Sequence, residues 1–173
     1  MWERGRISLM VHQGISAGDV CEVRNIPATE LPWQLLLEAD PHRPHIENYV
    51  ERAVWLGLYE HERLLGVAGL VQYRPHTVEL MNIAVEPARR RQGLGKRLVQ
   101  VAIERACLMG ARKVVLGTGN SSLDALAFYQ KLGFRMEAVD RDHFVRTYPL
   151  PIVENGIVCR DMVRLGLSIE PLL

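Results

Sequence analysis

The sequence predicts an α/β domain with β-hairpins in its first half and one β-α-β crossover in its second half. The chain has 173 residues, a length that suits a single domain with its own core. Strand-like apolar runs dominate the first half, whereas apolar residues recur at helical spacing in the second. The predicted element order is β-α-α-β-β-β-α-β-α-β-β.

The first half is predicted to hold four strands and two short helices. Residues 1–18 contain several small residues and show no clear period, so they are expected to form a poorly ordered extension, and residues 19–173 the single domain. Thr29 is a suitable N-cap for the first helix. Strands are expected at Asp19 to Ile26, Val54 to Glu60, Leu64 to Tyr73 and Thr77 to Val85, and helices at Glu30 to Ala39 and His45 to Arg52.

The second half begins with a long amphipathic helix from Leu94, which Gly110 ends. A polar stretch with two prolines, Asp140 to Asn155, is expected to be a long loop. The remaining predicted elements are a strand at Lys113 to Thr118, a helix at Leu123 to Leu132 capped by Ser122, a strand at Phe134 to Val139 and a last strand at Ile157 to Leu167.

Composition argues against several classes of protein. The net charge of +1 gives no field that would recruit nucleic acid or an anionic membrane. No apolar run approaches the roughly 18–20 residues that span a bilayer, and none resembles a secretory signal. Three cysteines without a C-x-x-C pattern indicate buried thiols in a reducing compartment, so we expect a cytoplasmic protein. The six histidines lack metal-ligand spacing, and no metal is expected.

A short basic loop with two glycines, residues 86–96, joins a strand to the amphipathic helix. The amides at a helix N-terminus bind anions, and Gly93 and Gly95 let a bulky anion approach the backbone. Neither the dinucleotide fingerprint nor the P-loop fits, because Leu98 and Arg90 stand where those motifs need glycine. Taken alone, the basic run is equally compatible with a solvated turn.

Two blocks together resemble the GNAT (GCN5-related N-acetyltransferase) family. Arg90-x-x-Gly93-x-Gly95 is similar to the family's coenzyme A loop, and residues 125–134, which contain Tyr129 and end in Gly-Phe, look like its later helix. The resemblance covers about residues 19 to 167. It implies an N-acetyltransferase with a mixed, mostly antiparallel central sheet that opens in a V-shaped splay, and acetyl-CoA as its co-substrate.

The same resemblance implies how acetyl-CoA is held. The pantetheine arm would pair with the backbone of the strand before the loop, and the diphosphate would sit on the loop amides. A pantetheine-binding asparagine of many members is replaced here by Ser122, with Asn120 two residues earlier, and either could make that contact. The implied coenzyme-binding residues are Ile83, Ala84, Val85, Arg90, Arg91, Gln92, Gly93, Leu94, Gly95, Lys96, Asn120, Ser122 and Tyr129.

Glu79 and Tyr129 are the predicted catalytic residues. An alkylammonium with a pKa of about 10.4 must lose a proton before it attacks a thioester. Glu79 is the predicted base, at a wet cleft and on one strand face with Met81, Ile83 and Val85; the alternative is a surface salt bridge. By resemblance, Tyr129 donates a proton to the leaving thiolate; the alternative is a core aromatic. A bulge around Ile83 to Val85 would supply oxyanion donors.

The predicted acceptor is a small-molecule or peptide amine of unknown identity. Its pocket is expected between Asp40 to Ile46 and Asp140 to Asn155, where Asp40, Asp140, Asp142 and Glu154 would attract a cation and His143, Phe144 and Tyr148 would form a wall. The later segment could instead space two strands or pack in a homodimer. His42 and His45 are expected to be solvated.

Two other functions remain open at this point. One is a non-catalytic acyl-CoA-binding sensor of the same fold, which would need the glycine loop but neither base nor acid. The other is a nucleic-acid-binding module that would use Arg89 to Arg91, Lys96 and Arg97. The near-zero net charge, and the absence of aromatic residues among these basic ones, disfavour the second.

Overall fold

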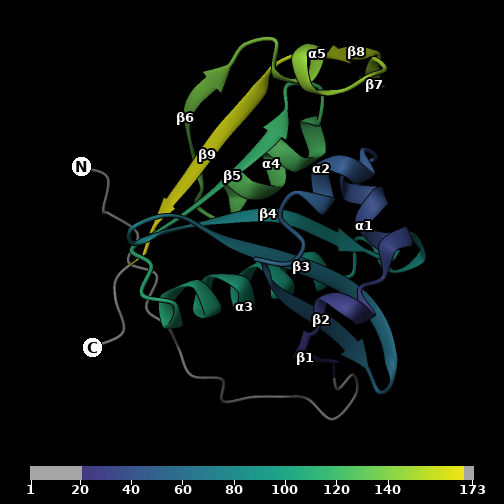
Figure 1. Cartoon of the computed structure of the whole chain (residues 1–173), viewed down its shortest axis with the longest axis vertical. Helices are drawn as coiled ribbons and strands as arrows, with labels where there is room; N and C mark the ends of the chain where they lie inside the picture. The colour runs from purple at the N-terminus through teal and green to yellow at the C-terminus, as the bar shows by residue number, and fades with distance from the viewer. Residues whose placement is uncertain (1–20, 170–173) are drawn as a thin grey trace.

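The computed structural model describes residues 21–169, which build one seven-stranded sheet with helices on both faces (Figure 1). The strand order is β1-β2-β3-β4-β5-β9-β6, and every neighbouring pair is antiparallel except β4 and β5. The mixed, mostly antiparallel sheet is therefore confirmed. The strands are β1 (Cys21–Ile26), β2 (Val54–Glu60), β3 (Arg63–Arg74), β4 (Thr77–Val85), β5 (Lys113–Gly119), β6 (Arg135–Asp140) and β9 (Met162–Ser168).

Two apolar cores lie on the two faces of this sheet. α3 (Leu94–Leu108) and α4 (Leu123–Lys131) cover one core, and α1 (Trp33–Ala39) and α2 (Arg43–Glu47) cover the other. Leu98 and Leu36, one from each core, are completely buried. Short 3-10 helices occupy Ala28–Glu30 and Pro87–Arg89. Within residues 21–169 no helix has the length and apolar character needed to cross a bilayer.

β4 parts from β5 after three residue pairs, which end at Glu79 opposite Val115. Just beyond this point β4 contains a bulge, because Leu80 pairs with Leu70 and Asn82 with Gly69, so that Met81 is an extra residue. A bulge bends its strand and increases the local twist. The predicted V-shaped splay is confirmed, but the bulge lies at Met81 and not at Ile83 to Val85.

The helices α1 and α2 differ from their predicted bounds. Thr29 is not an N-cap, because α1 begins four residues later at Trp33, after Pro32. α2 begins at Arg43, and Pro44 stands in its first turn, where a missing amide hydrogen costs no helical hydrogen bond. The second helix therefore begins two residues earlier than predicted, directly after Pro41 and His42, and ends at Glu47. The predicted extension 1–18 and the start of the first strand lie outside the described residues.

The segment predicted as a loop, residues 140–155, is structured. It contains α5 (His143–Thr147) and β7 (Ile152–Glu154), and β7 pairs with β8 (Ile157–Cys159) in a separate two-stranded sheet. The hairpin turn is Asn155-Gly156, with φ of 54° and 72°. Asn-Gly favours such a turn, because both residues tolerate positive φ. The predicted last strand is consequently split into β8 and β9.

Asn120 fixes the small sheet to the end of β5. Its Oδ1 accepts hydrogen bonds from the backbone N–H groups of Arg160 (2.8 Å) and Asp161 (2.9 Å), and its Nδ2 donates to the carbonyl of Val158 (3.1 Å). Both ends of the amide are therefore used by the link between β8 and β9. This arrangement indicates a structural role for Asn120, and the predicted contact with pantetheine could use only the second hydrogen of Nδ2.

Asn120→Ala is expected to lower the free energy of unfolding by about 1–3 kcal/mol, because two backbone donors lose their acceptor. Urea denaturation followed by circular dichroism measures this change. Gln130→Ala, which removes a side-chain hydrogen bond on the exposed side of α4, is the control and should change the free energy of unfolding little. Unchanged stability combined with weakened acetyl-CoA binding would instead make Asn120 a coenzyme ligand.

Candidate active site

A cleft of about 420 Å³ lies where β4 and β5 diverge. Because the two strands separate, side chains from both faces of the sheet border the same space. Tyr129 reaches it from α4, and Ala39 reaches it from the end of α1. The lining residues are Ala39, Leu80, Met81, Asn82, Ile83, Gly117, Thr118, Ser122, Asp124, Ala125, Tyr129, Glu154 and Asn155.

The N-terminus of α3 has the properties of an anion site. Gly93 precedes the helix with φ +81°, a conformation that favours glycine, and a Cβ there would meet no atom within 4 Å. The first amides of the helix, from Leu94 onward, have no partner in the helix itself. Arg91 and Lys96 are exposed and make no hydrogen bond or ion pair within residues 21–169. These groups suit a diphosphate.

Arg90, which was predicted to bind coenzyme A, has partners within the protein. Its Nε donates to the carbonyl of Val85 (3.1 Å) and its Nη2 to Glu38 on α1 (3.0 Å). Arg90 therefore braces the end of β4 against α1. Arg89 is likewise held by both carboxylate oxygens of Glu60. Local acidic partners thus take up two of the three consecutive arginines and leave Arg91 for a ligand.

Tyr129 is a core aromatic residue that also lines the cleft, so its place is compatible with both interpretations of its sequence position. Its ring packs edge-on against Phe128 and Phe134, with 8% of the residue exposed, while the residue also lines the cleft. The hydroxyl makes no hydrogen bond to any residue from 21 to 169. Burial raises the pKa of Tyr129 well above its ordinary value, so the phenol remains a hydrogen-bond donor.

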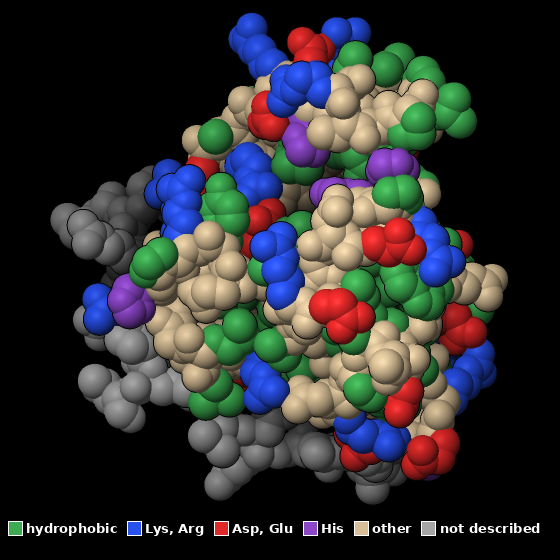
Figure 2. All heavy atoms as spheres, in the orientation of Figure 1, with side chains coloured by type: hydrophobic (Ala, Val, Ile, Leu, Met, Phe, Trp, Pro, Cys, Tyr) green, Lys and Arg blue, Asp and Glu red, His purple; other side chains and the backbone are tan. Residues whose placement is uncertain are grey.

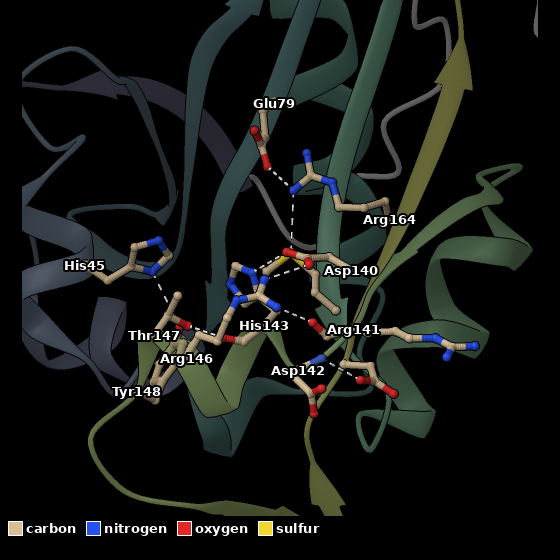
Figure 3. A network of polar contacts seen from close by, with 12 residues as sticks. His45, Glu79, Asp140, Arg141, Asp142, His143, Arg146, Thr147, Tyr148 and Arg164 are labelled. Carbon is tan, nitrogen blue, oxygen red and sulfur yellow. Dashed lines mark hydrogen bonds and ion pairs between the residues drawn. The ribbon is translucent and has the colours of Figure 1, made fainter.

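Glu79, which was predicted to stand at a wet cleft, is buried and is not among the residues that line the cleft. The residue is 8% exposed, and its Oε1 accepts a hydrogen bond from Nη1 of Arg164 at 2.7 Å (Figure 3). Its Oε2 accepts no hydrogen bond from the described residues. Burial of a carboxylate is costly unless it is paired, and Arg164 from β9 supplies that pairing. The contact is therefore the salt bridge that was the alternative role of Glu79, although the pair is partly buried and does not lie on the open surface.

The bulge also overturns the predicted alternation along β4. Leu80 and Ile83 contact the core beneath α3 and α4, whereas Met81 and Ala84 contact the core beneath α1 and α2. Ile83 therefore faces away from the side that Met81 takes. One extra residue moves every later side chain of the strand to the opposite face of the sheet. A prediction from strict alternation cannot include this change.

Ser122 lines the cleft but its hydroxyl is already engaged. The Oγ donates to Oε2 of Glu154 at 2.5 Å, and Ser121 donates to the same oxygen at 3.2 Å. Ser122 therefore does not cap α4, although it stands at the N-cap position. Its contact ties the β7–β8 hairpin to the cleft, and Glu154 thereby joins the cleft lining.

Asn82 is a cleft residue that the sequence analysis missed. It is 3% exposed, and its Nδ2 donates to the carbonyl of Leu36 (3.2 Å) and to the hydroxyl of Tyr49 (3.5 Å). Its Oδ1 is buried and has no donor among the described residues. A lone amide within an apolar strand was the available signal, because a buried polar side chain needs a reason.

The two segments predicted to form the acceptor pocket do meet. The hydroxyl of Tyr148, which follows α5, donates to Oδ1 of Asp40 at 3.0 Å, and Nδ1 of His45 lies 2.6 Å from Oδ2 of the same carboxylate. His45 is therefore not a freely solvated histidine. Figure 2 shows a hollow between the surface of α5, β7 and β8 and that of α1 and α2, with histidine side chains beside it.

Two other predicted carboxylates, Asp140 and Asp142, form ion pairs with residues near them in the sequence, in the segment 140–155 (the excursion) and just after it. Asp140 accepts from His143 (2.9 Å) and Arg146 (2.8 Å), and Asp142 accepts from Arg160 (2.6 Å). These pairs reduce their capacity to attract a cation. No three His, Cys, Asp or Glu side chains within residues 21–169 are grouped so that they could hold a metal ion.

Comparison with known proteins identifies the family. The model of the Acetyltransferase (GNAT) family matches residues 21–134. An uncharacterized N-acetyltransferase of Bacillus subtilis, YvbK, is 47% identical over 137 residues, which is 79% of this chain and 88% of that protein.

Solved structures agree. An IAA acetyltransferase from Bacillus cereus superposes with a TM-score of 0.83 at 43% identity, covering 86% of this chain and 99% of the other. A GNAT family acetyltransferase from Elizabethkingia anophelis with acetyl-CoA bound gives 0.85 at 35%, covering 88% and 100%. With the splayed sheet and the glycine loop in place, the chain belongs to the GNAT family of acetyl-CoA-dependent N-acetyltransferases.

Proposed function

We propose that this protein transfers an acetyl group from acetyl-CoA directly to a primary amine while both substrates are bound. The observation that carries the proposal is the cleft between β4 and β5, which is bordered by Tyr129 of α4 from one face of the sheet and by Ala39 of α1 from the other, with Glu154 of β7 also in its lining. Acetyl-CoA would enter from the α3 and α4 side and the amine from the α1 and α5 side. The acetyl-CoA in the Elizabethkingia neighbour supports the first half of this assignment.

The residues that would hold acetyl-CoA have complementary features. The amides from Arg91 to Lys96 and the charges of Arg91 and Lys96 suit the diphosphate. Beyond Glu79, β4 no longer pairs with β5, so the backbone of Ile83 to Val85 forms an edge that can pair with the amides of pantetheine. The glycine at 93 leaves room for the approach of a large anion.

Tyr129 and Glu79 divide the proton transfers in this proposal. Tyr129 keeps its proton because burial raises its pKa, and it donates a hydrogen bond to the sulfur as negative charge develops there. Glu79, whose Oε1 is fixed by Arg164, would act through water on the attacking nitrogen. Asn82, with its unpaired Oδ1, is placed to accept a hydrogen bond from a ligand in the cleft.

The direct test is acetyl-CoA-dependent thiol release with a panel of amines: spermidine, a lysine peptide, a peptide with a free N-terminal alanine, kanamycin and phenethylamine. We expect turnover of at least one and an acetylated product by mass spectrometry. Tight acetyl-CoA binding in calorimetry without turnover on the whole panel would contradict the proposed transfer and favour the non-catalytic sensor.

Reversing both free charges, in Arg91→Glu with Lys96→Glu, should weaken acetyl-CoA binding by about 10–100-fold, because hydrogen bonds to charged groups contribute about 1.5–3 kcal/mol. Calorimetry at low and high salt should also show a weaker salt dependence. Lys131→Glu reverses an exposed charge at the far end of α4 and serves as the control. Unaltered affinity in the double variant would place the diphosphate elsewhere.

Tyr129→Phe and Glu79→Gln should each reduce kcat, by roughly 10²–10⁴-fold for an acid–base group, with little change in the Kd of acetyl-CoA. Steady-state kinetics on the best amine of the panel and calorimetry separate the two effects. Circular dichroism controls for loss of the Glu79–Arg164 pair. A folded variant with the wild-type kcat would exclude its residue from the chemistry.

A further inference from the structure

His45, the buried carboxylate of Asp40 and Tyr148 meet at the end of α1, where Asp40 directly follows Ala39 of the cleft lining. We propose that His45, held by Asp40 and Tyr148, takes the proton that an acceptor ammonium must lose before it can attack. This inference rests on the proposed acetyl transfer to an amine. His45 would be a catalytic residue, and Asp40 and Tyr148 would be positioning residues.

The geometry leaves one nitrogen of His45 available. Nδ1 lies 2.6 Å from Asp40 Oδ2 and 3.4 Å from the Tyr148 hydroxyl. With Nδ1–H donated to the carboxylate, Nε2 carries the lone pair of the neutral ring. Nε2 makes no hydrogen bond within residues 21–169, and 35% of the side chain is exposed. The pair thus has the form of a base oriented by a carboxylate.

Asp40 is organised to hold a charge. It is 7% exposed and accepts hydrogen bonds from the backbone N–H of His42 (3.0 Å), from the Tyr148 hydroxyl (3.0 Å) and from His45. Burial alone would raise the pKa of Asp40, but these hydrogen bonds outweigh it and keep the pKa below its usual value. An ionised, fixed carboxylate is what stabilises an imidazolium after it gains a proton.

The position of the pair connects it to the cleft. Ala39, which lines the cleft, is followed directly by Asp40. The Tyr49 hydroxyl accepts a hydrogen bond from the Asn82 amide, and the Tyr49 ring contacts the His45 ring at a centroid distance of 6.0 Å. In Figure 3 His45 lies to the left of Glu79 and Arg164, and Tyr148 lies below it. In the proposed arrangement the amine arrives from this α1 and α5 side.

The proton balance of the step closes without another reactant. One N–H bond of the ammonium breaks, its proton binds Nε2, and the electron pair left on nitrogen attacks the thioester carbonyl. The imidazolium, stabilised by Asp40, returns its proton to water through its exposed side. A second proton is lost after the C–N bond forms and reaches the thiolate sulfur, which is the part of the reaction assigned to Glu79 and Tyr129.

The surrounding charges set the pH dependence. The hydrogen bond to Asp40 raises the pKa of His45 above 6.5; burial opposes this, and the charges of Asp40 and Glu79 add to it. A base must be neutral, so kcat should rise as the pH passes upward through this raised pKa. The titratable and charged groups that face His45 are Asp40, His42, Tyr49, Glu79 with its partner Arg164, and Tyr148.

The experiment compares His45→Gln with His76→Gln, an exposed histidine in the turn between β3 and β4 whose Nδ1 also has a hydrogen-bond partner, the carbonyl of Gly110 (3.1 Å). Acetyl transfer is measured from pH 5.5 to 9 on the same five amines. His45→Gln should lower kcat by roughly 10²–10⁴-fold and abolish the rise in rate with pH, whereas His76→Gln should keep both. Asp40→Asn should move the rise to lower pH, because His45 loses the interaction that raises its pKa.

Added imidazole supplies a second measurement. Turnover of His45→Ala should recover with imidazole concentration, an outcome that a purely structural role would not produce, and circular dichroism checks its fold. The wild-type pH profile and kcat in folded His45→Gln would overturn the inference, as would a folded but inactive His45→Ala that imidazole does not rescue. Absence of turnover by the wild-type protein on every amine would instead refute the proposed transfer itself.

Discussion

The divergence of β4 from β5 is the constraint on which the rest of the structure depends. Three residue pairs join these strands, and the bulge at Met81 then bends β4 away. Without that separation, the two sheet faces would be isolated from each other and the core beneath α3 and α4 would have no route to the α1 side. With it, Tyr129 and Ala39 border one cleft. The opened strand also leaves backbone groups that need partners, and in a closed sheet these groups would be unavailable to a ligand.

Polar anchors hold the walls of this opening in place. Arg90 ties the end of β4 to Glu38 on α1, Asn120 and Ser122 tie the β7–β8 hairpin to the end of β5, and Tyr148 ties the excursion to Asp40. Because each contact joins segments that are distant in the sequence, it fixes the relative positions of the walls. The proposed coenzyme side has two cations, Arg91 and Lys96, without partners among residues 21–169, whereas the proposed acceptor side presents paired carboxylates, aromatic rings and the imidazoles of His42, His45 and His143. The asymmetry matches an anionic coenzyme on one side and an amine on the other.

Local patterns in the sequence were sufficient for most of the sheet. The spans of β2 and β4 and the start of α3 agree with their predicted bounds, because apolar alternation and the glycine at 93 are local signals. The role of Arg90 was not predictable, since its partner Glu38 lies 52 residues away. Likewise, the hydrogen-bond partners of the two His45 nitrogens cannot be assigned from residues 40–46 alone, because Tyr148, which completes the cluster, lies far along the chain. The β7–β8 hairpin did have a local signal, Asn155-Gly156, which the prolines around it obscured. Tyr129 lines the cleft, but its catalytic role stays a prediction, as does that of Glu79, whose burial depends on Arg164, 85 residues away.

The central claim is that acetyl-CoA binds along the opened edge of β4 and on the first turn of α3. Amide hydrogen exchange with and without acetyl-CoA tests it most directly, since it reports on each backbone N–H in solution. We expect acetyl-CoA to slow exchange in two segments, residues 82–86 and 91–97, with little change in the paired strands β1 and β2. Saturating acetyl-CoA that leaves both segments unprotected, or that protects a different surface, would contradict the account.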